Sequence, residues 1–177
     1  HCLALERICA HFFGKGQSIE KKVVILWKTK QVGHNNRRDC IMTEDTFKDL
    51  CLCGETTKVQ FKEAFTSQRE IAKEMIAFAN TKGGVILFGV EDKSGKPVGL
   101  SYEQIQVISR ELGNAANEQV RPTIYIETEV VRLEEKHFLI CSVEEGKNKP
   151  YKNLNGEIWV KQGADKRRIT ENAEILA

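Results

Sequence analysis

Lysines and arginines are concentrated in one stretch of the chain, and two aromatic residues lie among them. From Glu145 to Arg168 there are seven basic residues against three acidic ones, with Tyr151 and Trp159 in between. A locally positive surface attracts the phosphate backbone of a nucleic acid, and an exposed aromatic ring stacks on an unpaired base. The alternative is an ordinary solvated face with Trp159 in the hydrophobic core, and composition alone favours neither.

Signatures of other chemistries are weak or missing in the sequence. It contains no G-x-x-x-x-G-K-[ST] phosphate loop and no G-x-S-x-G nucleophile motif, so neither ATP binding nor serine hydrolysis has support. Cys51 and Cys53 form a C-x-C pair that His34 and Cys40 would in principle complete as a metal site. No two cysteines have C-x-x-C spacing, so we expect no bound metal. Because the chain is long, shows no secretory signal and has enough apolar residues for a core, we expect free thiols and a cytoplasmic location.

The net charge of +2 hides an asymmetry between the two ends of the 177-residue chain. Residues 1–41 hold 8 basic and 3 acidic side chains, a net charge of +5. Residues 42–177 hold 19 basic and 22 acidic side chains, a net charge of −3. A nucleic acid would therefore be held by a local patch and not by general basicity. No apolar run approaches the roughly 18 residues of a transmembrane helix, so we expect no membrane partner.

Alternating strand and helix patterns must position the basic residues. Thr43 begins a short helical pattern with acidic residues in its first turn. The other expected elements are strands at 57–65, 85–90, 123–132, 138–143 and 158–161, and helices at 67–81 and 101–116. The order of these main elements, β-α-β-α-β-β-β, predicts an α+β domain with two layers, a mixed sheet and two main helices.

Caps and apolar stripes support the two main helices. Ser67, followed three residues later by Glu70, has the spacing of a capping box, and Ser101 caps the second helix. The expected buried faces contain Ile71, Met75, Phe78, Ile105 and Leu112. After the first helix, Gly83 and Gly84 either let the backbone approach a ligand or end the helix and permit tight packing.

Four separated segments carry a resemblance to a known family. They are 54–62 (GETTKVQFK), 77–84 (AFANTKGG), 86–92 (ILFGVED) with 97–100 (PVGL), and 158–164 (IWVKQGA). Together they resemble the Schlafen/AlbA-type DNA-binding domain found in predicted bacterial transcriptional regulators. The resemblance spans about residues 43–170 and implies an Alba-like, Schlafen-core-like fold.

The resemblance implies a DNA-binding domain of a transcriptional regulator that needs no cofactor. DNA is the expected partner and RNA a second one. We expect a homodimer, because small domains gain affinity and site length by two-fold pairing. The expected nucleic-acid-binding residues are Lys62, Asn80, Lys82, Lys149, Lys152, Lys161, Lys166, Arg167 and Arg168.

A different activity, RNA cleavage, is the alternative that the resemblance implies. The Schlafen branch resembles a metal-dependent endoribonuclease with three clustered acids, whose positions match Glu55, Gln60 and Asp92. Mg²⁺ or Mn²⁺ would be a cofactor only in that case, and Gln60 supplies a neutral, weaker ligand than a carboxylate. The alternative to catalysis is a structural role, in which Glu55 is a solvated residue and Asp92 caps a turn. A third possible function is a protein-interaction module.

Residues 1–41 form a basic N-terminal extension to the proposed domain of residues 42–177. Met42 resembles a natural start, so we expect the extension to contribute little to the core. The competing interpretation is that Val23–Trp27, five apolar residues in a row, adds an edge strand to the sheet.

Overall fold

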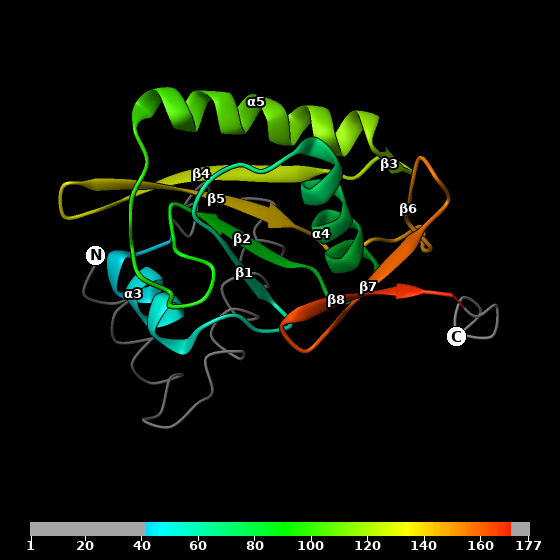
Figure 1. Cartoon of the computed structure of the whole chain (residues 1–177), viewed down its shortest axis with the longest axis horizontal. Coiled ribbons are helices and arrows are strands. Elements are labelled where there is room, and N and C mark those ends of the chain that lie inside the picture. Colours follow the sequence, from blue (N-terminus) through cyan, green and yellow to red (C-terminus); the bar gives the residue numbers. More distant parts are fainter. Residues whose placement is uncertain (1–41, 171–177) are drawn as a thin grey trace, which may run out of the picture. The chain divides into compact units, whose positions relative to one another are not determined.

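A computed structural model of the chain describes residues 42–170 (Figure 1). Residues 1–41 and 171–177 lie outside this part, and so does the strand predicted at Val23–Trp27. The helices of the described part are α3 (Glu44–Cys53), α4 (Gln68–Asn80) and α5 (Tyr102–Glu118). None of these helices is long and apolar enough to cross a membrane.

The described chain also contains strands that form three sheets. They are β1 (Val59–Lys62), β2 (Gly84–Phe88), β3 (Val120–Arg121), β4 (Ile126–Leu133), β5 (Lys136–Val143), β6 (Lys152–Asn153), β7 (Ile158–Gln162) and β8 (Asp165–Ile169). The main sheet has the order β1-β2-β5-β4, with β1 parallel to β2 and the other neighbours antiparallel. The predicted α+β class with a mixed sheet is therefore confirmed.

The strand β2, predicted at 85–90, lies between β1 and β5, and all five of its residues are buried. Its continuous apolar sequence explains this position, because a strand covered on both faces has no reason to alternate. β1 is shorter than the predicted strand at 57–65, and Ala64 is exposed beyond its end.

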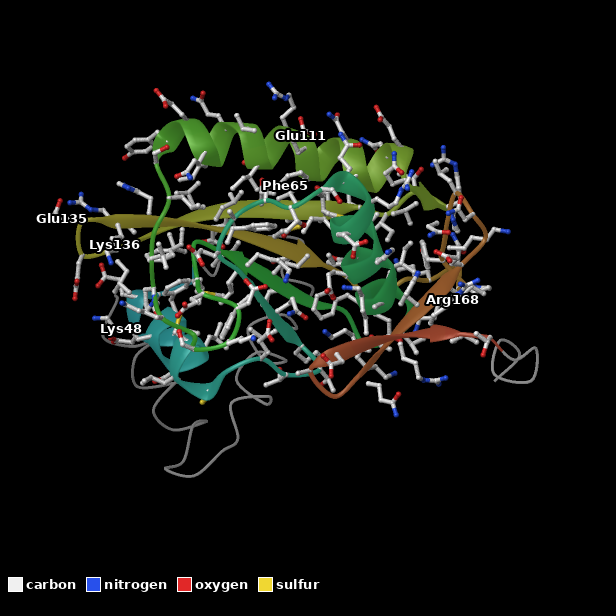
Figure 2. All side chains as sticks on the ribbon, in the orientation of Figure 1. Lys48, Phe65, Glu111, Glu135, Lys136 and Arg168 are labelled. Atoms are coloured by element: carbon white, nitrogen blue, oxygen red, sulfur yellow. The ribbon has the colours of Figure 1, made fainter. Side chains whose placement is uncertain are left out.

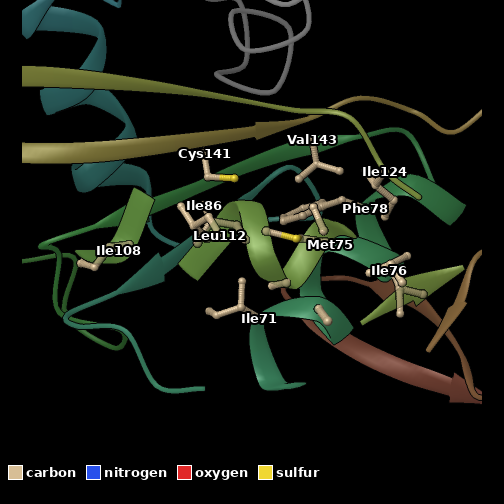
Figure 3. Close-up of a cluster of buried hydrophobic side chains, with 14 of the residues drawn as sticks. Ile71, Met75, Ile76, Phe78, Ile86, Ile108, Leu112, Ile124, Cys141 and Val143 are labelled. Carbon is tan, nitrogen blue, oxygen red and sulfur yellow. The ribbon is translucent and has the colours of Figure 1, made fainter. Parts of the chain in front are cut away.

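Helices α4 and α5 cover one face of the main sheet (Figures 1 and 3). The five predicted core residues are all buried in this layer, which confirms the helical periodicity. From the sheet, the core receives Ile86, Phe88, Leu139, Cys141 and Val143. These residues are cross-strand neighbours on a single face.

The other face of the sheet is covered by the short helix α3. The ring of Phe47 lies 4.6 Å, between centroids, from that of Phe138 in β5, and Leu50 is buried beside it. Cys51 is buried on the same side of the helix, whereas Leu52 is 84% exposed.

Both main helices begin at the predicted serine caps. Ser101 and Gln104 form a reciprocal capping box at the start of α5. At α4, Ser67 Oγ accepts from the Glu70 amide at 3.2 Å, but the Glu70 carboxylate pairs with Lys73. Only half of the predicted box therefore forms.

The C-terminal part of the described chain is a β-hairpin that packs against α4. Its first strand, β7, contains the predicted strand at 158–161. The second strand, β8, was not predicted, because its sequence Asp-Lys-Arg-Arg-Ile has no apolar alternation. A further short pair, β3 with β6, places Arg121 opposite Lys152.

The two glycines after α4 bring separate backbone segments close together. The Gly83 amide donates to the carbonyl of Phe78 at 2.9 Å and so closes the helix. Gly83 has φ of +67°, and a Cβ there would lie 2.7 Å from the Val143 carbonyl oxygen and 2.8 Å from the Glu145 nitrogen. The close approach expected from the sequence is thus made to the chain itself, at the end of β5.

Candidate nucleic-acid interface and a buried polar network

A chain of hydrogen bonds connects the start of β1 to the C-terminal hairpin. Glu55 Oε1 accepts from the Phe61 amide at 2.9 Å and from the Gln60 side-chain nitrogen. The Gln60 side-chain oxygen accepts from Lys161 Nζ at 2.8 Å. These contacts fix both ends of the Gln60 amide between a carboxylate and an ammonium group.

Two lysines of the hairpin converge on one buried carboxylate of α4. Lys166 Nζ lies 2.7 Å from Glu74 Oε1, and Lys161 Nζ lies 3.7 Å from Glu74 Oε2. The Lys161 and Glu74 side chains are only 1% and 5% exposed. Buried charges of this kind are tolerated when they are paired and hydrogen-bonded, and Lys161 also donates to the Ala164 carbonyl.

Burial changes the protonation equilibria of this network in opposite directions. Desolvation raises the pKa of Glu55, and the Phe61 amide and the Lys62 ammonium partly oppose this. Desolvation lowers the pKa of Lys161, and the nearby carboxylates of Glu74 and Glu55 partly oppose this. Each shift disfavours the charged form of a group that its neighbours stabilise.

Asp92 lies near this network and binds the same strand. Its carboxylate accepts from Lys62 Nζ at 2.7 Å and from the Glu63 amide at 3.0 Å. Glu55 and Asp92 thus bind two amides, those of Phe61 and Glu63, on the side of β1 that faces away from β2. The unpaired side of this edge strand is closed by carboxylates from its own chain.

The arrangement does not fit a divalent metal centre. The Gln60 side-chain nitrogen donates to the Glu55 carboxylate, and the Gln60 side-chain oxygen accepts from Lys161. The Asp92 carboxylate is paired with the Lys62 ammonium. A site for Mg²⁺ or Mn²⁺ needs several free anionic oxygens, and residues 42–170 hold no cluster of three such ligands. We therefore derive no cleavage step from these residues.

Asn80, at the end of α4, joins three segments through its side-chain amide. Its nitrogen donates to the carbonyls of Tyr151 at 2.8 Å and Trp159 at 2.9 Å, and its oxygen accepts from the Tyr151 amide at 2.7 Å. One side chain thereby holds the helix end, the connection before β6, and β7.

Replacing Asn80 by alanine should cost about 2–4 kcal/mol of unfolding free energy, because three backbone groups lose their partners together. Urea unfolding of the full chain measures this loss. Asn114→Ala, at a partly exposed position of α5, should change stability by less than about 0.5 kcal/mol. Equal effects of the two variants would contradict the role assigned to Asn80.

The nine predicted nucleic-acid-binding residues fall into two groups. Five of them bind groups of the protein itself: Lys62, Asn80, Lys161 and Lys166 as described, and Arg168, whose guanidinium lies 2.9 Å from Glu157. The other four, Lys82, Lys149, Lys152 and Arg167, are exposed on the surface, and two of them, Lys82 and Lys149, also lie beside the Glu145 carboxylate. The first group builds the fold around the hairpin, and the second is accessible to a polyanion.

The segment 145–155 runs beside α4 in the opposite direction. At the C-terminal end of the helix, the Gly146 amide donates to the Ala79 carbonyl and Lys149 Nζ to the Thr81 carbonyl. Toward the first turns of the helix, the same segment lies beside Ala72 and Arg69. A helix of 13 residues is about 20 Å long, so the two run together over that distance.

Exposed basic side chains lie along α4 and the segment 145–155 beside it. We call them the basic strip: Lys82, Lys149, Lys152, Arg121 and Arg69. Figure 2 shows several nitrogen-tipped side chains projecting around β3 and β6, in the region of the labelled Arg168. Glu145 lies among the lysines, 2.8 Å from Lys149 and 3.4 Å from Lys82, and the Lys149 hydrogen bond lowers its pKa. Lys82 remains largely free to reach solvent, with 76% of its side chain exposed.

Arg69 and Arg121 were missed from the sequence. Arg121 joins the strip because β3 pairs with β6 and places it opposite Lys152, and Arg69 because the turn after β6 reaches the first turn of α4. Both contacts connect residues far apart in the chain. No local pattern contains that information.

The cysteines of the C-x-C pair lie in different surroundings. Cys51 is buried and Cys53 is exposed, as expected for residues separated by about 200° around a helix. Burial raises the pKa of the Cys51 thiol to about 11 and that of Cys141 to about 12, so both are protonated at neutral pH. His34 and Cys40 lie outside the described residues.

The fold and the surface together define an α+β domain with a mixed four-stranded sheet, a hairpin bound through buried charges and a narrow basic strip. Residues 55–170, more than half of the chain, match the Schlafen, AlbA_2 family, and the chain belongs to it. The resemblance found from four sequence segments is therefore confirmed.

Individual relatives cover different parts of the chain. It is 35% identical over 85 residues to the uncharacterized ATP-binding protein UU034 of Ureaplasma parvum serovar 3, which is 46% of this chain and 24% of that protein. The chain thus spans about a quarter of this relative.

Two solved structures are similar. The N-terminal domain of a RecG-related protein from Nitrosomonas europaea has a TM-score of 0.54 at 23% identity and covers 73% of this chain and 94% of that domain. This likeness supports the fold. The DIP2311 protein of Corynebacterium diphtheriae has a TM-score of 0.49 at 17% identity, over 85% of this chain and 27% of that one.

Proposed function

We propose that this domain binds nucleic acid through the basic strip, with DNA as its principal partner, and that it serves a transcriptional regulator. The observation that carries the proposal is the separation of the cations. Five of the nine predicted residues bind other groups of the fold, and three of the remaining four, Lys82, Lys149 and Lys152, gather along α4 and the segment beside it. Membership in the Schlafen, AlbA_2 family supports a nucleic-acid-related function. The solved neighbour, named for its relation to the DNA helicase RecG, points in the same direction.

The geometry of the strip suits contacts with a phosphate backbone. Lysines and arginines spread along about 20 Å meet several successive phosphates, and each contact releases condensed counterions. Lys161 and Lys166 act differently in this proposal, because they hold the hairpin against Glu74 and so position β7 beside the strip. The proposal requires no cofactor.

Two-fold pairing would double the number of phosphate contacts. The strip is short and residues 42–177 carry a net charge of −3, so one copy gains little from general electrostatic attraction. We therefore propose that the domain works as a homodimer in the cytoplasm, with RNA as a secondary partner.

Replacing Lys82 and Lys149 together by glutamine should reduce affinity for a nucleic acid about tenfold at low salt and lower the salt slope by about 2, because each phosphate contact contributes ~0.9. Fluorescence anisotropy of the full chain with labelled duplex and single strands, at two salt concentrations, measures both quantities. The matched control replaces Lys48 and Lys136, which lie at the opposite end of the view from Arg168 (Figure 2).

The control removes the same charge and should leave affinity within about twofold, since rim charges distant from a contact act only through the screened field. Equal losses in both double variants would contradict binding by the strip. Absence of binding to any duplex or single strand at low salt would remove the proposed function altogether.

A further inference from the structure

A shallow recess lies at the end of the basic strip, where three elements meet. It is lined by Arg69 and Ala72 of α4, Gln119 after α5, and Asn153, Leu154 and Asn155 at the β6–β7 turn. The exposed guanidinium of Arg69 stands at one end of the basic strip, and Lys152 of the strip adjoins the turn. A strand that follows the strip reaches this recess.

The turn that forms one wall of the recess is held firmly. Asn153 Oδ1 accepts from the amides of Asn155 at 3.0 Å and Glu157 at 2.9 Å, and Asn153 Nδ2 donates to the Glu157 carboxylate at 2.7 Å. Glu157 is in turn paired with Arg168. The hydrogen bonds around Asn153 therefore fix the position of Leu154, at the tip of the turn, before any ligand arrives.

The polar groups of the recess are available for a ligand. In the part of the chain that the structure describes, the side-chain amides of Gln119 and Asn155 have no hydrogen-bond partner, and the guanidinium of Arg69 forms no ion pair. Leu154 is 58% exposed, although a large apolar side chain gains by burial. The recess thus offers an apolar surface, two amides that both donate and accept, and one planar cation.

This combination matches the parts of a nucleotide. A guanidinium binds a phosphate through two parallel hydrogen bonds, an amide pairs with the edge of a base, and an apolar side chain covers the face of a base. A phosphate alone would use only Arg69. The faces of bases in a duplex are already stacked on their neighbours, so Leu154 contacts a base face only in a single strand, a loop or a frayed end.

We infer that the recess accepts one unpaired nucleotide, so that the domain prefers single-stranded to double-stranded nucleic acid. This inference rests on the proposed function and names the substrate form of the same surface. Arg69 holds the phosphate of that nucleotide, Leu154 contacts the face of its base, and the amides of Gln119 and Asn155 contact the base edge.

Anisotropy titrations of the full chain test the inference with a single DNA strand of about 16 nucleotides, the same strand in a duplex, and an RNA strand of the same sequence. We expect single strands to bind roughly tenfold tighter than the duplex, and Leu154→Ala to remove most of this preference without changing duplex affinity. Leu52→Ala, at another exposed leucine, should leave the preference intact. The tighter of the DNA and RNA strands identifies the sugar that the recess accepts.

Failure of the inference is distinguishable from failure of the proposed function. Equal affinity for single strands and duplex, or equal weakening of both by Leu154→Ala, overturns the recess while leaving the strip intact. Binding of nothing at low salt overturns both proposals. A nucleoside 5′-monophosphate should shift the NMR signals of the Gln119 and Asn155 side-chain amides, and an equal shift with inorganic phosphate would show a phosphate site only and overturn the inference.

Discussion

Replacing Glu74 by alanine should lower the free energy of unfolding by about 3–5 kcal/mol, because it leaves the buried Lys161 ammonium without its carboxylate. The Lys161 side chain is only 1% exposed, so water does not replace the lost charge, and Lys166 loses its partner oxygen on Glu74 as well. The hairpin should be held less tightly against α4, and urea unfolding of the full chain at pH 7 measures the loss.

Glu70→Ala provides the matched control on the same helix. Glu70 pairs with Lys73 near the surface, where such pairs contribute about 0–1 kcal/mol. A Glu74 variant no less stable than the Glu70 variant would contradict the importance of the buried pair. Replacing Glu74 and Lys161 together by methionine should recover part of the loss, because it removes both charges from the interior.

The loss caused by Glu74→Ala should also shrink as the pH rises. Desolvation already lowers the pKa of Lys161, and removal of Glu74 takes away the group that most opposes this. Between the folded pKa and the unfolded value of about 10.4, the unfolded chain binds more protons than the folded one, so stability increases with pH in that window. Below the folded pKa the full loss persists.

Replacing Gly83 by alanine should destabilise the domain by more than about 4 kcal/mol, since it combines backbone strain with a steric clash. The new Cβ would lie 2.7 Å from the Val143 carbonyl oxygen and 2.8 Å from the Glu145 nitrogen, both backbone atoms that no side-chain rotation moves. The end of β5 would have to separate from the end of α4. Thermal unfolding followed by circular dichroism measures the effect.

Gly156→Ala isolates the backbone strain from the clash. Gly156 has φ of +78°, similar to Gly83, but a Cβ there would have no atom within 4 Å. Its substitution should cost only about 1–2 kcal/mol. If both variants lose the same stability, the close approach at Gly83 has no energetic importance.

Much of the fold is predictable from the sequence because its signals are local. Ser67 and Ser101 mark the starts of α4 and α5, their apolar stripes repeat with the helical period, and the unbroken apolar run of β2 indicates a central strand. The strand β8 has no such signal, because its charged side chains are positioned by pairing with β7 and by contacts with α4.

The candidate site is harder to predict from the sequence than the fold, because its contacts join residues that are far apart in the chain. The sequence groups Lys161 with the exposed lysines, yet strand pairing turns it inward toward Gln60, 101 residues away in the chain. Glu74 follows Lys73 in α4, as expected for a polar residue on a solvated face, and only the hairpin makes it a buried partner. A polar pattern does not reveal which charges will be buried together.

The carboxylates that occupy one side of β1 also affect how the sheets of two copies of the domain could pair. Two sheets that meet edge to edge form a chain of unlimited length only if each copy has two open sides. Here Glu55 and Asp92 occupy the amides on the side of β1 that faces away from β2. A strand from another copy could therefore pair with β1 only by displacing these carboxylates, whereas β4 is the opposite edge of the same sheet.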